Sequence, residues 1–180
     1  MIMADYIYTV SKKKFYPLNP DSDSIDIRDI AHALSMLARA NGHFPSFHSV
    51  AQHSIECANE AIARGLSPRL CLGCLLHDGA EAYMSDVTTP VKNRLDDYRQ
   101  YEDKLINAIY EKYALSFSEE EKEIIYKIDK DLLYYEFYHY MGIELSQKPQ
   151  ILSEPVFEER SFKDVENEFM RIFEALTRQQ

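Results

Sequence analysis

The chain has 180 residues, of which 46% are hydrophobic, and a formal net charge of -10 at pH 7. This length predicts one domain with a real core, and the acidic balance disfavours DNA, RNA and anionic membranes as partners because nothing supplies a basic surface. The first residues do not resemble a signal peptide, no segment approaches the roughly 20 apolar residues of a membrane span, and the three cysteines cannot all pair, so we expect a reduced, cytoplasmic protein.

The first part of the chain predicts a small hairpin followed by three helices. Residues 6–10 and 14–16 are β-prone on either side of a polar turn. Apolar residues from Ile27 to Ala38 follow helical spacing, and that helix is expected to end near Asn41-Gly42. A second helix is predicted over residues 49–64. A third begins at Ser67-Pro68, with serine at the N-cap and proline in the first turn.

The rest of the chain predicts further helices. Residues 86–90 form a break with a new helix start, and residues 95–113 predict a long helix. Ser118 opens a capping box for a helix that runs to about Leu145, and a last amphipathic helix covers residues 162–176. The expected fold is therefore an all-α bundle with a small N-terminal β-hairpin.

The most informative residues are His77-Asp78, at the end of an apolar run in the third helix. Adjacent side chains leave a helix about 100° apart, so an imidazole nitrogen and a carboxylate oxygen can reach one point beside it. Such a pair suits a divalent metal ion. Glu81 follows one turn later on the same helix face. The ordinary alternative is a hydrogen-bonded pair at a helix end, which becomes less favoured if other helices supply further ligands.

Two ionisable residues occupy apolar stripes, where a charge is costly without a partner. His53 shares its stripe with Cys57, and the ordinary alternative for it is a core histidine bonded to a backbone carbonyl. On the helix that begins at Ser118, Asp129 falls inside the apolar arc, whereas Asp131 falls outside it and is expected to be solvated. Glu136 shares the stripe of Asp129 and could hydrogen-bond a metal ligand.

These residues carry a family resemblance. His53, His77-Asp78 and Asp129 resemble the H…HD…D signature of HD-domain metal-dependent phosphohydrolases. The sequence is also similar to bacterial 5'-deoxynucleotidases in four ordered blocks, which are residues 50–54, 77–86, 89–92 and 118–129. Residues 26–43 resemble a related branch that includes phage dATP triphosphohydrolases. The resemblance covers about residues 6–145.

The resemblance implies a mononuclear metal site with four ligands, namely His53, His77, Asp78 and Asp129. The ion would be Co, Mn, Zn or Fe, with Mg²⁺ as the alternative for a triphosphate substrate. The resemblance also implies one HD phosphohydrolase domain with an N-terminal extension (1–24), a core (25–145) and a C-terminal segment (146–180) that contains the last helix.

The same resemblance suggests roles for the residues around the metal site. Glu81 is expected to orient or deprotonate the attacking water, and Asp86 to act as general acid on the leaving oxygen. Arg39, on a stripe of the first helix, corresponds to a phosphate-binding arginine, which suits its forked guanidinium. Lys92, near a helix start, is a second candidate for the phosphate. Thr88 stands where the deoxynucleotidases have a proline that lines the base pocket.

The resemblance implies hydrolysis of small nucleotides, and its longer motif match favours a 5'-deoxynucleotidase that releases phosphate from deoxynucleoside monophosphates. A single nucleotide needs only local positive charge, whereas a net charge of -10 would repel a long polyanion. The alternatives are a deoxynucleoside triphosphate triphosphohydrolase, a non-catalytic nucleotide-sensing protein, and a structural helical oligomer in which the histidines and aspartates are incidental. A homo-oligomer is compatible with all of these readings.

Overall fold

The computed structural model describes residues 5–180, and the expectation about the first four residues lies outside this part. The elements in chain order are β1 (Ile7–Tyr8), β2 (Lys14–Phe15), the 3-10 helix η1 (Ser22–Ser24), α1 (Ile27–Met36), the 3-10 helix η2 (Arg39–Gly42), α2 (Val50–Ala63), α3 (Pro68–Leu76), α4 (Glu81–Met84), α5 (Thr89–Lys92), α6 (Asp96–Lys112), α7 (Glu119–Met141) and α8 (Phe162–Thr177). Strands β1 and β2 are antiparallel, with Ile7 opposite Phe15. The predicted all-α fold with a small N-terminal hairpin is confirmed.

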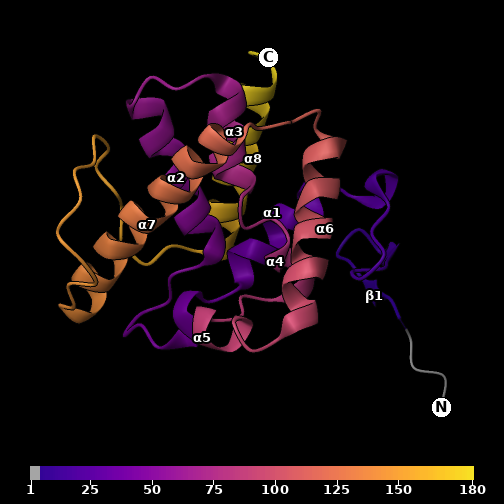
Figure 1. Ribbon diagram of the computed structural model, residues 1–180, viewed down its shortest axis with the longest axis horizontal. Helices are drawn as coiled ribbons and strands as arrows, with labels where there is room; N and C mark the ends of the chain where they lie inside the picture. The colour runs from indigo at the N-terminus through magenta and orange to yellow at the C-terminus, as the bar shows by residue number, and fades with distance from the viewer. Residues whose placement is uncertain (1–4) are drawn as a thin grey trace.

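The helices pack around a core to which α2 and α3 contribute most (Figure 1). Helix α8, drawn in yellow, lies against α1, α2 and α3, so the last helix of the chain closes the core made by the first three. Helix α7 packs on α2 and α3, and α6 packs on α3. Within residues 5–180, no helix combines the length and the apolar character needed to cross a membrane.

Serine caps begin the helices that carry the site. The Ser49 hydroxyl accepts a hydrogen bond from the Gln52 backbone N–H, and the Gln52 side chain accepts one from the Ser49 N–H, which starts α2 with a full capping box. Ser118 and Glu121 form the same motif at the start of α7. Ser67 caps α3. These helix starts agree with the sequence prediction to within a residue or two.

Two helix ends differ from the prediction. Helix α1 ends at Met36 rather than near Asn41, because the next residues turn extended and pair with the segment before α2, with the Val50 N–H donating to the Leu37 carbonyl. Helix α7 ends at Met141 rather than about Leu145, because Gly142 adopts φ +67°, the left-handed conformation that terminates a helix cheaply.

A close approach of α3 to α7 depends on one glycine. A Cβ atom at Gly73 would lie 2.6 Å from the Phe117 ring and 2.8 Å from Cδ1 of Ile125, which belongs to α7. A side chain at position 73 would therefore force the Phe117 ring and the end of the Ile125 side chain to shift. This approach matters for the site, because α3 leads into His77 and α7 carries Asp129.

The segment between α7 and α8 is held against α2 by two glutamates one turn apart. The Glu60 carboxylate accepts hydrogen bonds from the Leu152 N–H, the Ser153 N–H and hydroxyl, and Arg64 Nε. Glu56 is 5% exposed and accepts one bond from the Val156 N–H at 3.3 Å. Burial raises the pKa of Glu56 to about 7. Burial alone would also raise the pKa of Glu60, but the bonds from Ser153 and Arg64 lower it overall.

This difference predicts opposite effects of two matched substitutions. Because the folded-state pKa of Glu56 is raised, the protein loses stability as pH rises from about 4.5 to about 7, and Glu56→Gln removes that loss. We expect the unfolding free energy of Glu56→Gln to exceed that of the wild type by up to about 3 kcal/mol at pH 8, and by much less at pH 5. Glu60→Gln should instead destabilise by about 2 kcal/mol, because it loses charged hydrogen bonds. Urea unfolding at both pH values measures this, and a pH-independent effect of Glu56→Gln would contradict it.

Candidate metal centre

His53 lies on α2 with its side chain fully buried, and its partners are carboxylates rather than a backbone carbonyl. Its Nδ1 donates a hydrogen bond to Oε1 of Glu136, at 2.6 Å, and Glu136 is itself 1% exposed on α7. This bond fixes the ring so that Nε2 points to Asp129. A carboxylate behind the histidine is the usual support of a metal-ligating imidazole.

His77 immediately follows α3, at its C-cap. Its Nδ1 donates to the backbone carbonyl of Cys74 at 2.8 Å, which fixes the ring from behind and leaves Nε2 for other partners. Among residues 5–180, this buried Nε2 makes no hydrogen bond of good geometry, although Asp78 Oδ2 lies 3.3 Å from it. The sequence analysis expected Glu81 to lie one turn after His77 on the same helix face. The chain instead leaves the helix here, and Glu81 begins the separate short helix α4.

Four side chains from α2, the end of α3 and α7 bring donor atoms to one point. His53 Nε2 lies 3.1 Å from Asp129 Oδ1, and His77 Nε2 lies 3.3 Å from Asp78 Oδ2. The two crosswise distances, His53 to Asp78 and His77 to Asp129, are both 3.9 Å. Neighbouring ligands of an ion with bonds of about 2.1 Å are separated by about 3.0–3.4 Å. The two shorter distances lie in this range, and the two crosswise distances are about half an ångström longer, so small side-chain shifts would bring all four groups to one ion.

The pKa shifts in this cluster favour protonated histidines beside ionised aspartates. Burial lowers the pKa of His77, but Asp78 and Asp129 outweigh it and raise that pKa well above its ordinary value. Burial would raise the pKa of Asp129, but hydrogen bonds and charge from His53 and His77 hold it well below its usual range. Metal ligands must be deprotonated, so a dication at this point would take the place of these protons.

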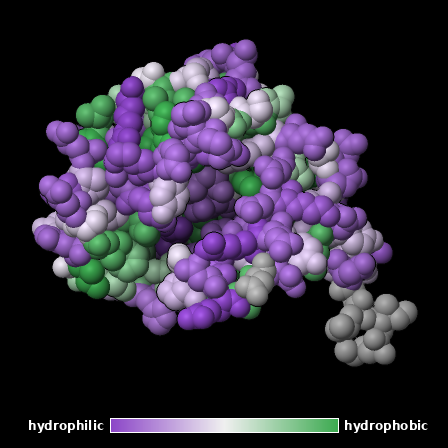
Figure 2. Space-filling model, in the orientation of Figure 1, coloured by the Kyte–Doolittle hydropathy of each residue, from purple (hydrophilic) through white to green (hydrophobic). Residues whose placement is uncertain are grey.

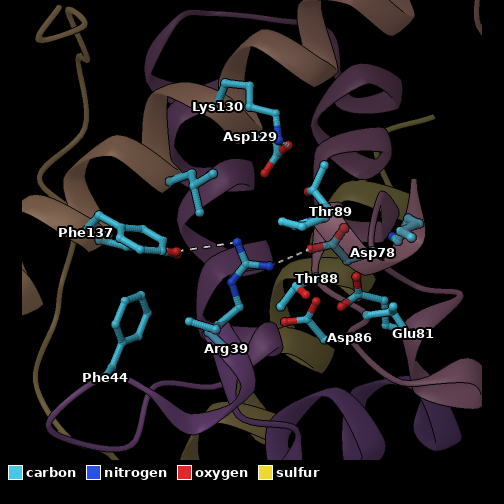
Figure 3. A pocket seen from close by; sticks show the side chains of 16 residues that line it. Arg39, Phe44, Asp78, Glu81, Asp86, Thr88, Thr89, Asp129, Lys130 and Phe137 are labelled. Atoms are coloured by element: carbon cyan, nitrogen blue, oxygen red, sulfur yellow. Dashed lines mark hydrogen bonds and ion pairs between the residues drawn. The ribbon is translucent and has the colours of Figure 1, made fainter. Parts of the chain in front are cut away.

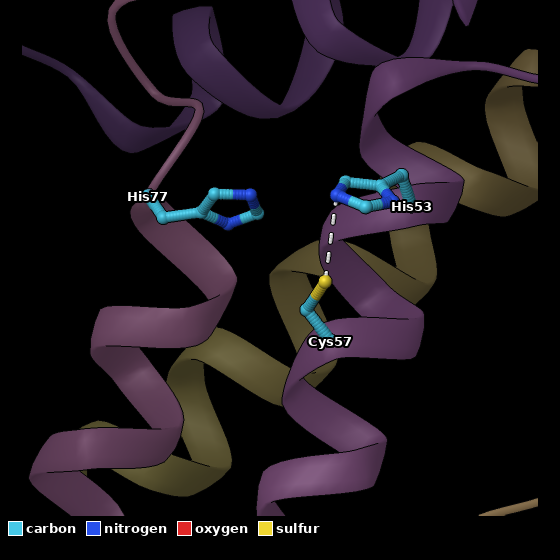
Figure 4. A group of neighbouring side chains, drawn as sticks. All are labelled: His53, Cys57 and His77. Atoms are coloured by element: carbon cyan, nitrogen blue, oxygen red, sulfur yellow. Dashed lines mark hydrogen bonds between the residues drawn. The ribbon is translucent and has the colours of Figure 1, made fainter. Parts of the chain in front are cut away.

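A further group that can hold a metal ion consists of His53, Cys57 and His77 (Figure 4). Their ligand atoms lie within 4.8 Å of one another, and Cys57 Sγ is 3.5 Å from His53 Nε2. The sequence analysis placed Cys57 on the stripe of His53 but did not predict it as a ligand. The signal was present in the spacing, because residues four apart on a helix lie on one face.

A pocket of about 290 Å³ opens beside the four-residue cluster (Figure 3). Asp78, Glu81 and Asp86 lie on one side of it, Asp129 and Lys130 on another, and Phe44 and Phe137 on a third. Figure 2 shows a hollow near the centre of this face, bordered mostly by hydrophilic residues. The volume lies near the small end of ligand pockets, about 300–1,000 Å³, and fits a small molecule better than a polymer.

Arg39 reaches this pocket from η2, and not from a helical stripe as predicted. It is 8% exposed, with Nη1 3.3 Å from Asp78 and Nη2 3.4 Å from Glu136. The pairing of the chain after α1 with the loop before α2 positions it there, and the following Ala40 takes φ +51°. Arg39 therefore lies beside the cluster, and each of its two terminal nitrogens contacts a different carboxylate.

Glu81 and Asp86 both line the pocket and both have raised pKa values. Burial is the main cause of the raised pKa of Glu81, and the charges of Asp78 and Asp86 add to it. Burial also raises the pKa of Asp86. The Glu81 Oε2 atom is buried with no hydrogen-bond partner in the described part of the chain. Raised pKa values bring carboxyl groups closer to the range in which they can both accept and donate protons, so these two are candidates for proton transfer.

The remaining predicted residues also lie at the pocket, together with one lysine that the sequence analysis missed. Thr88 and Lys92 line it, although Lys92 Nζ also pairs with Glu102 at 2.6 Å. Lys130 was not predicted; its Nζ lies 3.0 Å from Asp129 Oδ2, and it lines the same pocket. Its place next to Asp129 in the sequence gave no separate signal.

The expected solvation of Asp131 is wrong. Asp131 is 6% exposed, and it pairs with Arg64 Nη2 at 3.0 Å and with Lys127 Nζ at 2.9 Å. The helical wheel put it outside the apolar arc that contains Asp129. It is nevertheless buried, because Arg64 at the end of α2 covers that side of α7.

The chain is similar to two bacterial proteins whose functions are not established. It is 40% identical to the uncharacterized protein YfdR of Escherichia coli over 111 residues, which is 61% of this chain and 59% of YfdR. It is 36% identical to an uncharacterized protein of Rhodobacter capsulatus over 112 residues, which is 59% of this chain and 57% of that protein. The match thus spans slightly less than three fifths of each relative. No family model matches the chain.

Proposed function

We propose that the protein is a metal-dependent phosphohydrolase of small nucleotides, of the HD type that its sequence resembles. The observation that supports this most is the convergence of His53, His77, Asp78 and Asp129 beside a pocket that contains three cationic side chains. A divalent ion held by these four residues would supply Lewis acidity and a polarised water at the pocket. The pocket-lining cations are Arg39, Lys92 and Lys130.

The residues around the ion have separate roles in this proposal. Glu81 orients the attacking water and accepts its proton, and Asp86, whose pKa burial raises, donates a proton to the leaving oxygen. Arg39 meets the phosphate with its fork, and Lys92 and Lys130 add positive charge. The uncharged side chains of Thr88, Phe44 and Phe137 line the part of the pocket that would contact the nucleoside. Because both Glu81 and Asp86 line the pocket, we favour a catalytic protein over a non-catalytic nucleotide sensor.

The substrate we favour is a 2'-deoxynucleoside monophosphate, cleaved to the nucleoside and inorganic phosphate. The resemblance in residues 50–54, 77–86 and 89–92 supports this choice, and the small pocket agrees with it. The second candidate is a deoxynucleoside triphosphate that loses triphosphate, which the resemblance of residues 26–43 favours. Chromatographic separation of products from both substrate sets distinguishes them, because nucleoside appears with phosphate in one case and with triphosphate in the other.

The role of Arg39 gives a prediction about substrate affinity. Arg39→Lys keeps the charge but loses the forked guanidinium that would meet the phosphate in the pocket, so KM should rise roughly tenfold, the size of one charged hydrogen bond. Arg64→Lys is the matched control. Arg64 also bridges two carboxylates, but it lies at the C-terminal end of α2 and is not among the described residues that line the pocket. Steady-state kinetics of both variants checks this. An unchanged KM in Arg39→Lys, or an equal rise in Arg64→Lys, would contradict the assignment.

A further inference from the structure

Cys57 occupies a place that the proposed chemistry does not use. It lies one turn after His53 on α2, is 1% exposed, and directs Sγ to within 3.5 Å of His53 Nε2 (Figure 4). An ion bound by a histidine at about 2.05 Å and a thiolate at about 2.3 Å, at a tetrahedral angle, separates the two donor atoms by about 3.6 Å. The observed distance therefore suits joint ligation by the two side chains.

A second, independent observation points to the same place. His77 comes from a different element, and its buried Nε2 makes no hydrogen bond of good geometry among residues 5–180, although Asp78 Oδ2 lies 3.3 Å away. A ligand atom of His77 nevertheless lies in the same group as Cys57 Sγ, within 4.8 Å. Asp78 and Asp129 line the pocket, whereas Cys57 is not among the described residues that line it. The thiol therefore approaches the centre from the interior, and the carboxylates approach it from the pocket side.

The ordinary reading is that Cys57 is a small core residue whose thiol donates weakly to His53. That reading accounts for the 3.5 Å contact, but it gives no reason why the thiol also lies within 4.8 Å of a ligand atom of His77, on a different element. Cys74 offers a comparison, because it is equally buried but donates to neither histidine; its backbone carbonyl, not its thiol, contacts His77. Within the described residues, Cys57 is thus the cysteine whose thiol lies close to both imidazoles.

The geometry points to the Cys57 thiolate as a direct ligand of the metal ion, giving a centre with imidazole, carboxylate and sulfur donors. This inference rests on the metal site of the proposed function and adds a ligand that the HD resemblance does not supply. On binding, the thiol would release its proton to solvent, because a coordinating thiol is deprotonated. Two imidazoles and a thiolate favour Zn²⁺ or Co²⁺ over Mn²⁺ or Mg²⁺, which prefer oxygen.

Cobalt spectroscopy tests this ligand without any assay of activity. The full chain is freed of metal with a chelator, loaded with one equivalent of Co²⁺, and examined for a thiolate-to-cobalt charge-transfer band in the near ultraviolet. We expect the band in the wild type and in the controls Cys71→Ala and Cys74→Ala, which alter the other buried thiols. Cys57→Ala and the closer-fitting Cys57→Ser should keep the visible cobalt bands but lose the charge-transfer band.

Metal titrations give a second readout. Loss of a thiolate ligand should weaken Zn²⁺ binding at least about tenfold, with a smaller change for Mn²⁺. Visible cobalt bands without a charge-transfer band in the wild type would overturn the role of Cys57 and leave the proposed hydrolase intact. A band that survives in Cys57→Ala would also overturn it. Failure of the wild type to bind any of these ions would overturn both the thiolate ligand and the proposed function.

Discussion

Asp129→Ala is expected to remove the metal ion and all metal-dependent activity, whereas Asp131→Ala keeps both. Asp129 contributes an oxygen 3.1 Å from His53 and 3.9 Å from His77, and its loss opens the α7 side of the centre. Asp131 lies two residues later but pairs with Arg64 and Lys127, away from the cluster. Removing it should lower stability by leaving Arg64 partly unpaired, without altering the metal site.

Metal content after gel filtration, measured beside melting temperature, checks this pair of variants. His53→Ala, His77→Ala and Asp78→Ala should behave as Asp129→Ala does. His53→Ala should also melt at a lower temperature, because it leaves the buried Glu136 without its closest partner. Full metal content in Asp129→Ala together with loss of metal in Asp131→Ala would show that the assignment of the two aspartates is reversed.

Glu81→Gln and Asp86→Asn are each expected to lower kcat by about 10²–10⁴ while metal content stays near that of the wild type. Both substitutions keep the shape of the side chain and remove the ability to exchange a proton. Because burial already disfavours the charged form of Glu81, its neutral amide should fold at least as well as the wild type.

Single-turnover and steady-state kinetics on metal-loaded protein measure this effect. Glu120→Gln, a change at an exposed carboxylate in the first turn of α7, is the control and should leave kcat unchanged. Wild-type turnover in either Glu81→Gln or Asp86→Asn would refute the role given to that residue. Loss of metal in either variant would instead make it a ligand or a support of the centre.

Local patterns predicted the presence and the starts of the long helices and the nearness of His53, His77, Asp78 and Asp129. The helical wheel placed Asp129 on the apolar side of α7, and its Oδ1 lies 3.1 Å from His53 Nε2. The wheel did not show that Asp131 is buried. Capping serines marked the helix starts, since their hydrogen bonds are made within three residues. Both kinds of signal are contained in a short stretch of chain.

The features that the sequence did not predict depend on contacts between distant segments. Asp131 is buried because Arg64, 67 residues earlier, reaches across to it. Arg39 enters the pocket because the chain after α1 pairs with the segment before α2, and no residue pattern within α1 encodes that pairing. Cys57 becomes a candidate metal ligand only because the packing of α3 on α2 brings His77 close to it. Such long-range placement lies beyond periodicity and capping rules.

The most direct test of the proposed function is phosphate release from deoxynucleoside monophosphates by metal-loaded protein and by the same protein freed of metal. We predict release of inorganic phosphate and nucleoside by the loaded form, none by the metal-free form, and recovery when Co²⁺, Mn²⁺ or Zn²⁺ is returned. Equal activity in both forms would contradict a metal-dependent mechanism. Release from neither mono- nor triphosphates, with activity instead on guanosine tetraphosphate or a cyclic dinucleotide, would contradict the proposed substrate.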